Sequence, residues 1–476
     1  MAEAVLAVDL GTTATKVIAV DRNAGVLASA EHGYPMRTTP SGEATHDPEV
    51  VFQAALRALA EVAAQGHRVR ALVLTGAMHT LLGLGSSGMP VTPSLSWADN
   101  RAVAEASRLR GTPEGRALHR ATGTPVHPMS PLVKLAWFTA HGITAHSWCG
   151  LKDFVALRLT GRLATEHSSA SGTGLMDLRS LAWHPDALAF AGVRAAALPE
   201  LLPPTTAFPL VLDVPGIPRG VPVVLGGGDG PMANLGVGAV VPGVAAVSMG
   251  TSGALRVVRD RPSVDERGRV FCYAIADGLW VSGGAVSNGG VVAQWAADTF
   301  QVDVPTLLRE AEGVPPGAAG VVALPYLLGE RAPWWDPDAR SALIGVRREH
   351  GRAEITRALV EGVAQQMALV LDAVRSVAEV HAVRVTGGAF RSALWGSVLA
   401  SALGLDLEAA EDSEGSGVGA GLLAWYALGE LPDLRAAATL IKPTHVIKPD
   451  AVAQHYYARH RPVVEQLYEA LSALGF

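Results

Sequence analysis

One short pattern near the N-terminus, an apolar run that ends in a turn of glycine and hydroxyl residues, limits the fold more than any other feature of the sequence. The run 5–10 carries Asp9 near its end and leads into Gly11-Thr12-Thr13, and the apolar pattern resumes directly after Lys16. This order predicts two strands joined by a tight turn. The turn offers backbone N–H groups and hydroxyls to an anion, with Lys16 close by, and Asp9 is placed to hold a magnesium ion through water.

The same pattern occurs a second time, at the head of the second half of the chain. Residues 243–249 form an apolar run that leads into Gly250-Thr251-Ser252, and Ser248 stands where the first copy has Asp9. Either copy alone indicates only a turn between strands. Because both halves open in this way, the repetition predicts a duplicated fold that closes over a nucleotide.

Size and composition predict a two-domain protein without a nucleic-acid or membrane partner. The chain has 476 residues, of which 49% are hydrophobic, so each half can bury its own core. A net charge of −6 argues against binding to nucleic acid or to an anionic membrane surface. No apolar stretch reaches the about 18 residues of a membrane span, and Asp9 interrupts the N-terminal run, which argues against a signal peptide. Cys149 and Cys272 are expected to be free thiols, as in a reducing cytoplasm, and a cytoplasmic location is expected.

The order of predicted elements in the first half indicates an α/β layer architecture. Short strands are followed by a helix with Asp47 at its N-cap and Pro48 at its first position, and then by a buried strand at 71–75. Residues 83–162 show few regular periods. This segment is expected either to line a site, as irregular polar segments often do, or to form a long surface insertion.

The second half repeats the order of strands first and helices later. Its helices are predicted at 289–300, 352–377, 392–403 and 417–428. The boundary between the halves falls just before the second turn, which divides the chain into domains 1–241 and 242–476.

A glycine elbow near the end of the first half carries an informative acid. Gly226-Gly227-Gly228 follows an apolar strand, but Pro231 occupies the third glycine position of the dinucleotide-binding pattern, so that interpretation fails. Asp229 comes directly after the glycines. It can serve as a helix N-cap, which its position alone favours, or as a base that takes a proton from a substrate hydroxyl. The sequence has neither a Walker A lysine nor the His and Cys spacing of a zinc site.

Taken together, these features resemble the spaced motifs of the FGGY carbohydrate kinases, which belong to the actin-like ATPase superfamily. The resemblance extends from about residue 5 to 428 and rests on the segments 9–16, 129–137, 250–253 and 387–389 and on Asp229. It implies an α/β fold of two duplicated actin-like ATPase (ribonuclease H-like) domains with a cleft between them. The N-terminal domain, 1–241, is expected to bind the sugar and carry the base, and the C-terminal domain, 242–476, is expected to bind the nucleotide.

The resemblance also implies roles for individual residues. Asp229 matches the catalytic base that activates a sugar hydroxyl for in-line attack on the γ-phosphate of ATP, and Asp9 matches the acid near Mg²⁺. The phosphate loops correspond to Thr12, Thr13 and Lys16 in the first domain and to Gly250 and Thr251 in the second. The rest of the nucleotide is expected at Gly290, Gln294, Gly388 and Ser392. The polyol is expected at Met78, His79, Asp99, Arg101 and Met129.

Within the family, several segments look most like the gluconate kinase branch, namely 78–82, 97–101, 123–131, 228–236 and 329–333. The expected reaction is the ATP-dependent phosphorylation of D-gluconate to 6-phosphogluconate, and a xylulokinase or another ketopentose or polyol kinase is the alternative. A sugar acid needs a cation for its carboxylate, and Arg101, His127 and Lys134 are the candidates. His127 can equally make a loop hydrogen bond, and Lys134 can equally be a snorkelling surface lysine.

Two other classes of protein share this fold. A non-catalytic sugar-responsive regulator would need a DNA-binding segment, and no basic helix-turn-helix stretch precedes Val5. An actin-like chaperone or filament protein would need a client-binding domain or polymer contacts, and the stretch after Leu428 is too short for such a domain. The expected ligands are therefore ATP, Mg²⁺ and a small-molecule sugar or sugar acid, and a homodimer is left open.

Overall fold

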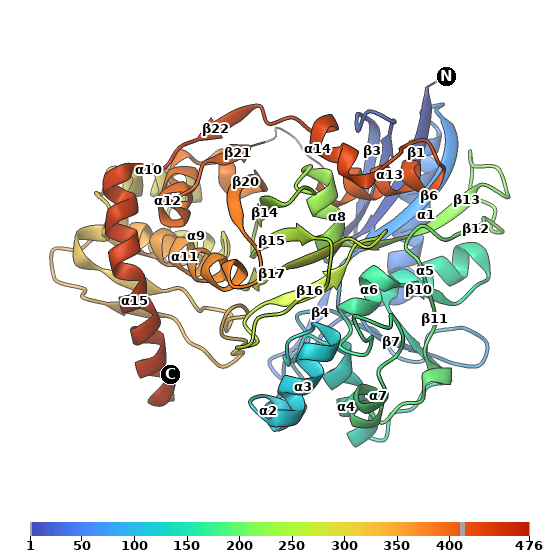
Figure 1. Ribbon diagram of the computed structural model, residues 1–476, viewed down its shortest axis with the longest axis horizontal. Helices are drawn as coiled ribbons and strands as arrows, with labels where there is room; N and C mark the ends of the chain where they lie inside the picture. Colours follow the sequence, from blue (N-terminus) through green and yellow to red (C-terminus); the bar gives the residue numbers. More distant parts are fainter. Residues whose placement is uncertain (1, 410–414, 476) are drawn as a thin grey trace.

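The chain folds into two lobes, each built on one central sheet (Figure 1). The computed structural model describes residues 2–409 and 415–475. In the first lobe the strands lie in the order β12-β13-β6-β1-β2-β3. Their bounds are β1 Glu3–Leu10, β2 Ala14–Val20, β3 Val26–Gly33, β6 Arg68–Gly76, β12 Ala207–Pro209 and β13 Pro222–Gly228.

The sheet of the second lobe has the order β16-β17-β15-β14-β20-β21-β22. Its strands are β14 Gly243–Met249, β15 Gly253–Arg259, β16 Phe271–Ala274, β17 Trp280–Val286, β20 Val380–Thr386, β21 Leu407–Ala409 and β22 His445–Ile447.

The two sheets repeat one arrangement. Each begins with an antiparallel meander, β1-β2-β3 in the first lobe and β14-β15-β17 in the second. A later strand then pairs in parallel with the first strand of the meander, β6 with β1 and β20 with β14. A further parallel strand, β13 or β21, lies beyond it. The α/β class and the duplication that the two turns predict are therefore confirmed.

Helices cover both faces of the first sheet, and the strand residues alternate between them. Val5 and Ala7 join the core beneath α8 (Asp229–Gly236) and α13 (Gly415–Ala427). Leu6 and Val8 join the core beneath α1 (Pro48–Ala63) and α5 (Leu151–Thr160). Because neighbouring side chains of a strand point to opposite faces, a sheet that is covered twice needs an unbroken apolar run, and 4–8 is such a run.

α8 and α13 pack closely against each other, and this is possible only because glycines, which have no side chain, lie at the contact. A Cβ placed on Gly236 would lie 1.7 Å from the carbonyl oxygen of Gly415, and a Cβ on Gly419 would lie 1.9 Å from that of Met232. Although α13 comes late in the sequence, it packs on the first sheet, beside β1 and β6 (Figure 1). The indole N–H of Trp425 donates to the backbone oxygen of Val20 at 3.1 Å. α13 therefore ties a late segment of the chain to the first lobe.

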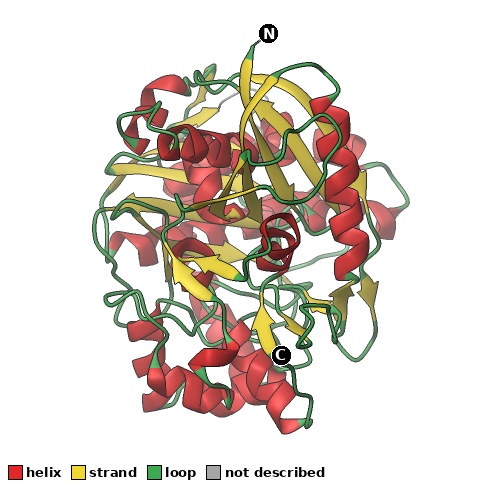
Figure 2. Cartoon of the chain, turned by 90° about the vertical axis from the view of Figure 1, so that its right-hand side faces the viewer, coloured by secondary structure: helices red, strands yellow, loops and turns green. Residues whose placement is uncertain are grey.

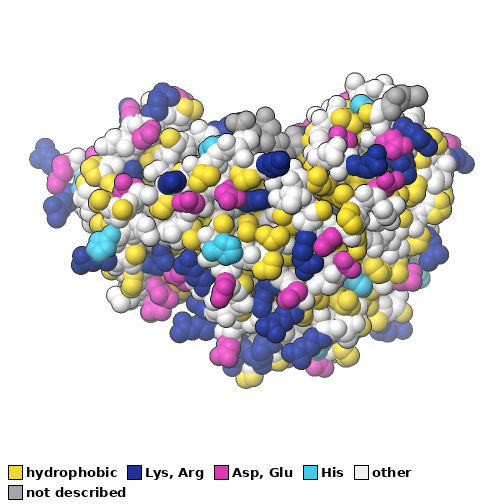
Figure 3. Space-filling model, turned by 45° about the horizontal axis from the view of Figure 1, so that its top comes forward, with side chains coloured by type: hydrophobic (Ala, Val, Ile, Leu, Met, Phe, Trp, Pro, Cys, Tyr) yellow, Lys and Arg dark blue, Asp and Glu magenta, His cyan; other side chains and the backbone are white. Residues whose placement is uncertain are grey.

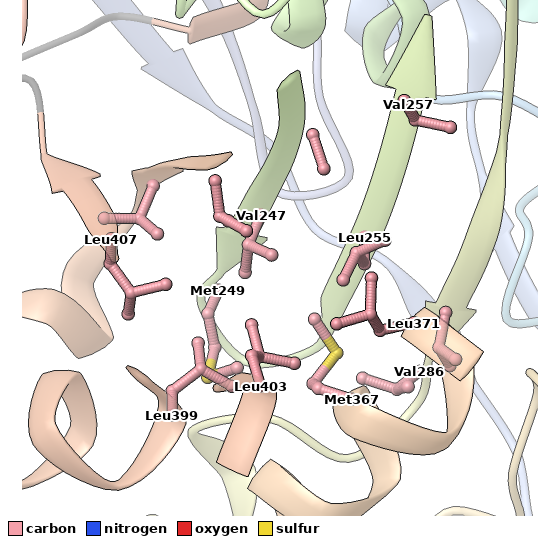
Figure 4. Close-up of a cluster of buried hydrophobic side chains, with 14 of the residues drawn as sticks. Val247, Met249, Leu255, Val257, Val286, Met367, Leu371, Leu399, Leu403 and Leu407 are labelled. Carbon is pink, nitrogen blue, oxygen red and sulfur yellow. The ribbon is translucent and has the colours of Figure 1, made fainter. Parts of the chain in front are cut away.

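The core of the second lobe lies between its sheet and the helices α11 (Arg352–Arg375) and α12 (Ala393–Leu403). Figure 4 shows side chains of β14 and β15 facing those of the two helices; the labelled residues are Val247, Met249, Leu255, Val257, Val286, Met367, Leu371, Leu399, Leu403 and Leu407. The helices predicted in this half are confirmed to within two residues at each end. The other elements here are α9 Val291–Phe300, α10 Val304–Glu312, β18 Val322–Leu324, β19 Ala342–Ile344, α14 Ala437–Leu440 and α15 Ala451–Ala473.

The prediction of an irregular segment over 83–162 is wrong, because four short helices, α2, α3, α4 and α5, lie within it. The helices α2, α3, α4 and α7 of this lobe lie below its sheet in Figure 1, and Figure 2 shows helices at the same lower end of the molecule. α3 and α4 begin at prolines, and α3 and α5 end at left-handed glycines, so none is long enough to show a period. The elements are β4 Arg37–Thr38, β5 Ala44–His46, β7 Leu82–Leu84, β8 Ser94–Leu95, α2 Val103–Leu109, α3 Pro113–Thr122, α4 Pro131–Ala140, β9 Ser147–Cys149, β10 Ala164–Glu166, α6 His167–Ser171, α7 Pro185–Ala191 and β11 Glu200–Leu202.

Several smaller predictions can be compared directly with the structure. Asp47 caps α1, accepting from the N–H groups of Glu49 and Val50, and the two cysteines are buried free thiols. Within 2–409 and 415–475, no helix has the length and apolar character that crossing a membrane requires. Figure 3 shows a face that is notched between the two lobes and on which positive and negative side chains are mixed.

Candidate active site

The β1–β2 hairpin forms the first of the two glycine–hydroxyl turns. The Gly11 N–H donates to the oxygen of Ala14 at 3.0 Å, and a Cβ on Gly11 would lie only 2.9 Å from that oxygen. Glycine is therefore required for so tight a turn. Thr13 is exposed at the tip and Thr12 is half-buried, so the tip of the turn is open to solvent at the end of the sheet.

The two charged residues predicted beside this turn lie on its two strands. The pairing register sets Asp9 opposite Lys16. The hydroxyl of Ser416, in the first turn of α13, donates to Oδ2 of Asp9. The acid therefore lies where the hairpin meets a helix from the far end of the sequence.

The β14–β15 hairpin forms the second turn and packs on the loop before α9. The N–H of Gly250 donates to the oxygen of Ser252 at 2.9 Å, and the N–H of Gly290 donates to the oxygen of Gly250 at 2.7 Å. A Cβ on Gly290 would lie 2.9 Å from this same Gly250 oxygen. Gly290 is thus needed for the close approach of the loop to the turn, and Thr251 is left exposed at the tip.

A cavity of about 640 Å³ opens beside the second turn. It is lined by all six second-lobe residues that the family resemblance assigns to the nucleotide, namely Gly250, Thr251, Gly290, Gln294, Gly388 and Ser392. Its volume lies within the usual range for cofactor pockets. Sequence reasoning missed other lining residues, among them Arg309, Glu312 and Arg391, because α10 carries no motif and the motif at 387–389 ends before Arg391.

Asp229 is the first residue of α8 and follows the glycine elbow directly. The interpretation of Asp229 as the N-cap is wrong, because Gly228 occupies that position. A Cβ on Gly226 would lie 1.7 Å from the oxygen of Leu74, and one on Gly228 would lie 2.6 Å from Cγ of Met78. The glycines therefore let the strand pass close to β6 and to the loop after it, which brings Asp229 beside Met78.

The charge of Asp229 is set by opposing effects. Burial raises the pKa of its carboxyl, while Arg256 of β15, the backbone N–H groups of Gly230 and Met78, and Arg331 lower it, and the net shift is upward. The Gly230 N–H donates to Oδ1 at 2.7 Å. A carboxylate with a raised pKa is a stronger base than an ordinary aspartate, which suits a group that removes a proton from a hydroxyl.

His79 lies in the loop after β6, with a left-handed backbone conformation (φ 65°) that is uncommon for a residue other than glycine. Its Nδ1 is 2.7 Å from the oxygen of Gly172, so Nδ1 carries the proton and Nε2 is left as an acceptor. Burial and the charge of Lys134 lower the pKa of His79 to about 3. The imidazole is therefore neutral and can accept a hydrogen bond from a substrate hydroxyl.

Lys134, on α4, fastens the loops around His79. Its Nζ donates to the oxygen of His79 at 2.8 Å and to that of Ser96 at 2.7 Å, and the side chain is fully buried. Burial lowers the pKa of Lys134 to about 7. His127 is also buried, and burial and the charge of Arg331 hold its pKa well below the ordinary value. The snorkelling interpretation of Lys134 is therefore wrong.

Asp99 and Arg101, two of the predicted polyol residues, pair with each other. Nη2 of Arg101 lies 2.8 Å from Oδ2 of Asp99, and its guanidinium lies 4.7 Å from the centre of the Trp137 ring. Asp99 also accepts from the Ala44 N–H at 3.0 Å and is fully buried. Met129 is buried too and joins the core cluster that contains Met78. Substrate contact by Asp99, Arg101 and Met129 stays a prediction.

Two side chains of the second lobe lie among these groups, and sequence reasoning gave them no role. The guanidinium of Arg331 lies 5.0 Å from the Trp97 ring centre, and the ring of Tyr273 lies 5.9 Å from that of His79. Arg331 belongs to the segment 329–333, which resembles the gluconate kinase branch. A charged residue in that segment could have been recognised from the sequence as a site residue. Tyr273 lies in an ordinary apolar strand, β16, and no sequence feature marks it as a site residue.

The edge of β16 is hydrogen-bonded to the first lobe close to these residues. The N–H of Cys272 donates to the oxygen of Gly123, and that of Ala274 donates to Oγ of Ser171, both at 2.9 Å. The site thus combines groups from both lobes: Asp229 and His79 from the first, and Arg256, Tyr273 and Arg331 from the second.

Comparison with known proteins agrees with this geometry. The model of the FGGY family of carbohydrate kinases, N-terminal domain, matches residues 4–236, and the model of its C-terminal domain matches residues 245–428. The chain is 34% identical to the gluconokinase of Bacillus subtilis (strain 168), covering 99% of this chain and 96% of the relative. Two solved structures from Lactobacillus acidophilus, a gluconate kinase and a ligand-bound xylulose kinase, each show 31% identity and a TM-score of 0.94 over 99% of both chains.

Proposed function

The chain belongs to the FGGY family of carbohydrate kinases, enzymes that transfer a phosphoryl group from ATP to an alcohol, and we propose that its substrate is D-gluconate. The product would be 6-phosphogluconate, with the phosphate on the terminal primary hydroxyl. The observation that carries the proposal is the pair of arginines from the second lobe beside the first-lobe site. Arg256 lies against the first turn of α8, which carries Asp229, Arg331 is buried over the Trp97 ring, and both charges act on Asp229, which favours an anionic substrate.

In the proposed reaction, Asp229 takes the proton of the acceptor hydroxyl as its oxygen attacks the γ-phosphorus. The bond between that phosphorus and the oxygen of the leaving ADP breaks in line, and ADP departs. His79 accepts a hydrogen bond from a sugar hydroxyl and so fixes the chain of the substrate. Phosphoryl transfer needs little covalent help, so alignment and fixed charges carry most of the effect.

We assign the nucleotide to the cavity beside the second turn, with its phosphates toward Gly250 and Thr251. Thr12, Thr13 and Lys16 would meet the phosphates from the first lobe. The contact of Trp97 with Thr12 (Nε1 to Oγ1, 3.0 Å) and with Arg331 supports this, because it links the first turn to the second lobe. The division at 241/242 then separates a sugar-binding part from a nucleotide-binding part, although α13 crosses back to the first sheet.

Magnesium fits the site as a partner of the nucleotide. No group of three or more His, Cys, Asp or Glu side chains suited to a metal occurs among the described residues. Mg²⁺ is usually held by one or two carboxylates together with phosphate oxygens and water, and Asp9 at the mouth of the first turn supplies one carboxylate. Such an ion, when bound, neutralises charge on the β- and γ-phosphate oxygens.

A coupled assay of ADP release tests the proposal. The substrates are D-gluconate, D-xylulose, glycerol and other polyols, each at a range of concentrations with saturating ATP. We expect D-gluconate to give the highest kcat/KM. D-Xylulose is the second candidate, because a solved structure of equal similarity is a xylulose kinase. A higher kcat/KM for D-xylulose would overturn the gluconate assignment and leave the kinase fold and Asp229 unaffected.

A further inference from the structure

We propose that Arg331 binds the carboxylate of the sugar acid while the acceptor hydroxyl at the other end of the substrate lies at Asp229. The proposal rests on gluconate being the substrate. Gluconate is a six-carbon chain with its carboxylate and its primary hydroxyl at opposite ends. A site that selects it therefore needs a base for one end and a cation with an available N–H group for the other.

Arg331 is a buried guanidinium whose donors are only partly used. The residue is 8% exposed, and its Nη2 donates to the oxygen of Val286 at 2.7 Å. Its Nε is buried and has no hydrogen-bond partner among the described residues. A buried N–H without a partner is costly, and in a native protein it calls for an explanation. A ligand oxygen at Nε provides one.

The carboxylate next to Arg331 in the sequence does not occupy that donor. Glu330 accepts instead from the backbone N–H of Ser287 at 2.6 Å and from the side chain of Asn288 at 3.2 Å. It also accepts from the backbone N–H of Arg331 itself, at 2.8 Å. Burial raises the pKa of Glu330 to about 7, so near neutral pH it supplies less than a full negative charge. An anionic ligand would therefore meet little competition from Glu330.

Of the other cations near the site, Arg101 and Lys134 are already bound to partners, and Arg256 lies at the end that carries the base. Nε and Nη2 of Arg101 both donate to the carboxylate of Asp99, at 2.8–3.1 Å. Nζ of Lys134 donates to two backbone oxygens. Arg256 donates to Oγ of Ser248 at 3.2 Å and lies beside the first turn of α8, where a Cβ on Gly230 would be 3.1 Å from its Nε. Arg101, the first candidate from the sequence, is thus neutralised by its neighbour.

The positions of Arg256 and Arg331 fit the two ends of the substrate. Arg256 lies against Gly230, the residue after Asp229, and lowers the pKa of the Asp229 carboxyl, so Arg256 is placed at the end that carries the base. Arg331, by contrast, is the charge that most lowers the pKa of His127. Among the same groups, the hydroxyl of Tyr273 is buried without a partner in the described chain, and Nε2 of His79 is an acceptor. These two atoms suit the hydroxyls of the polyol between the ends.

The test compares D-gluconate with D-gluconamide, which has the same carbons and hydroxyls but a neutral carboxamide. The measured quantity is the ratio of their kcat/KM values in the coupled assay, for the wild type, Arg331→Gln and Arg101→Gln. We expect the wild type to prefer gluconate on the order of 30-fold, as for loss of one charged hydrogen bond. Arg331→Gln should bring the ratio close to one, mainly through the KM of gluconate, whereas Arg101→Gln should keep the preference even where both values fall.

Each outcome decides between distinct claims. A wild type that phosphorylates D-xylulose but neither gluconate nor gluconamide refutes the proposed substrate. A wild type that phosphorylates gluconate without preferring it over gluconamide refutes the carboxylate contact and leaves the kinase assignment intact. A preference that survives Arg331→Gln, or one that Arg101→Gln removes, refutes the role of Arg331. Should Arg331→Gln fail to fold, Arg331→Met, which keeps an apolar stem on the Trp97 ring, carries the same test.

Discussion

The guanidinium carbon of Arg331 in the second lobe lies 5.0 Å from the centre of the Trp97 ring in the first lobe. Trp97 in turn donates to the hydroxyl of Thr12 at 3.0 Å. A single chain of contacts therefore runs from the loop that carries Arg331 to the first glycine–hydroxyl turn. These contacts fix the relative position of the two lobes and lie next to the candidate site. Substitutions at the lobe interface should therefore also change the activity.

The hydrogen bond between Ser171 and Ala274 should contribute measurably to the docking of the lobes. Oγ of Ser171 is buried and accepts from the Ala274 N–H at 2.9 Å. Ser171→Ala leaves that N–H unpaired, so we expect the free energy of unfolding to fall by about 1–3 kcal/mol. Urea denaturation measures the change, and Ser169→Ala on the same helix, where the side chain is half-buried, is the matched control. Equal midpoints for both variants would contradict the expectation.

The acidic limb of the pH–rate profile should report Asp229. The base is active as a carboxylate, so kcat/KM falls as the pH drops through its pKa, which burial raises above that of an ordinary aspartate. Arg256 is the charge that most opposes this rise. Arg256→Gln should therefore move the acidic limb to higher pH, by an amount that a profile of kcat/KM between pH 4 and 9 resolves. A limb that stays in place or moves to lower pH would show that Arg256 does not act on the base.

Close packing of α8 on α13 makes Gly419 a sensitive position. A Cβ there would lie 1.9 Å from the oxygen of Met232, so Gly419→Ala forces the helices apart. We expect a loss of stability of about 3 kcal/mol or more, because backbone rather than a flexible side chain must move. Gly415→Ala, at the start of α13, is the control, since nothing lies within 4 Å of its Cβ position. Similar melting temperatures for the two variants would contradict this account of the helix contact.

A larger side chain at Gly388 should weaken ATP binding in the cavity beside the second turn. This glycine lines the cavity, and nothing lies within 4 Å of its Cβ position, so Gly388→Val is tolerated by the fold but intrudes on the nucleotide. We expect the KM for ATP to rise at least about tenfold, equivalent to ~1.4 kcal/mol, with little change in the KM for gluconate. If the KM for ATP is unchanged while the melting temperature is retained, ATP binds elsewhere.

The sequence predicted most of the fold because its strongest signals are local. Each glycine–hydroxyl turn follows an apolar run, and their repetition indicated the duplication that the two sheets display. The helices of the second half follow from long apolar periods. The segment 83–162 escaped prediction because its helices are ten residues or shorter, and prolines or glycines bound several of them.

The candidate site was predictable only where a motif marks it. Asp229 stands on a glycine elbow, and the six cavity residues that were predicted lie near the second turn or on motifs of the family, whereas the lining residues on α10 do not. The sequence did not predict that Asp99 pairs with Arg101. Two charged residues that are close in sequence can bind each other or the substrate, and the sequence alone does not distinguish the two arrangements. Tyr273 and Arg256 lie on ordinary strands of the second lobe. Only the docking of the lobes brings Arg256 to Asp229 and Tyr273 to His79.

The most direct test of this account is the turnover of Asp229→Asn with D-gluconate and saturating ATP. The amide has the size of the carboxyl group but cannot take the proton of the acceptor hydroxyl. We predict a fall in kcat of roughly 100- to 10,000-fold, with ADP affinity by calorimetry and the melting temperature near those of the wild type. Turnover close to that of the wild type in the folded variant would contradict the account, because some other group would then be the base.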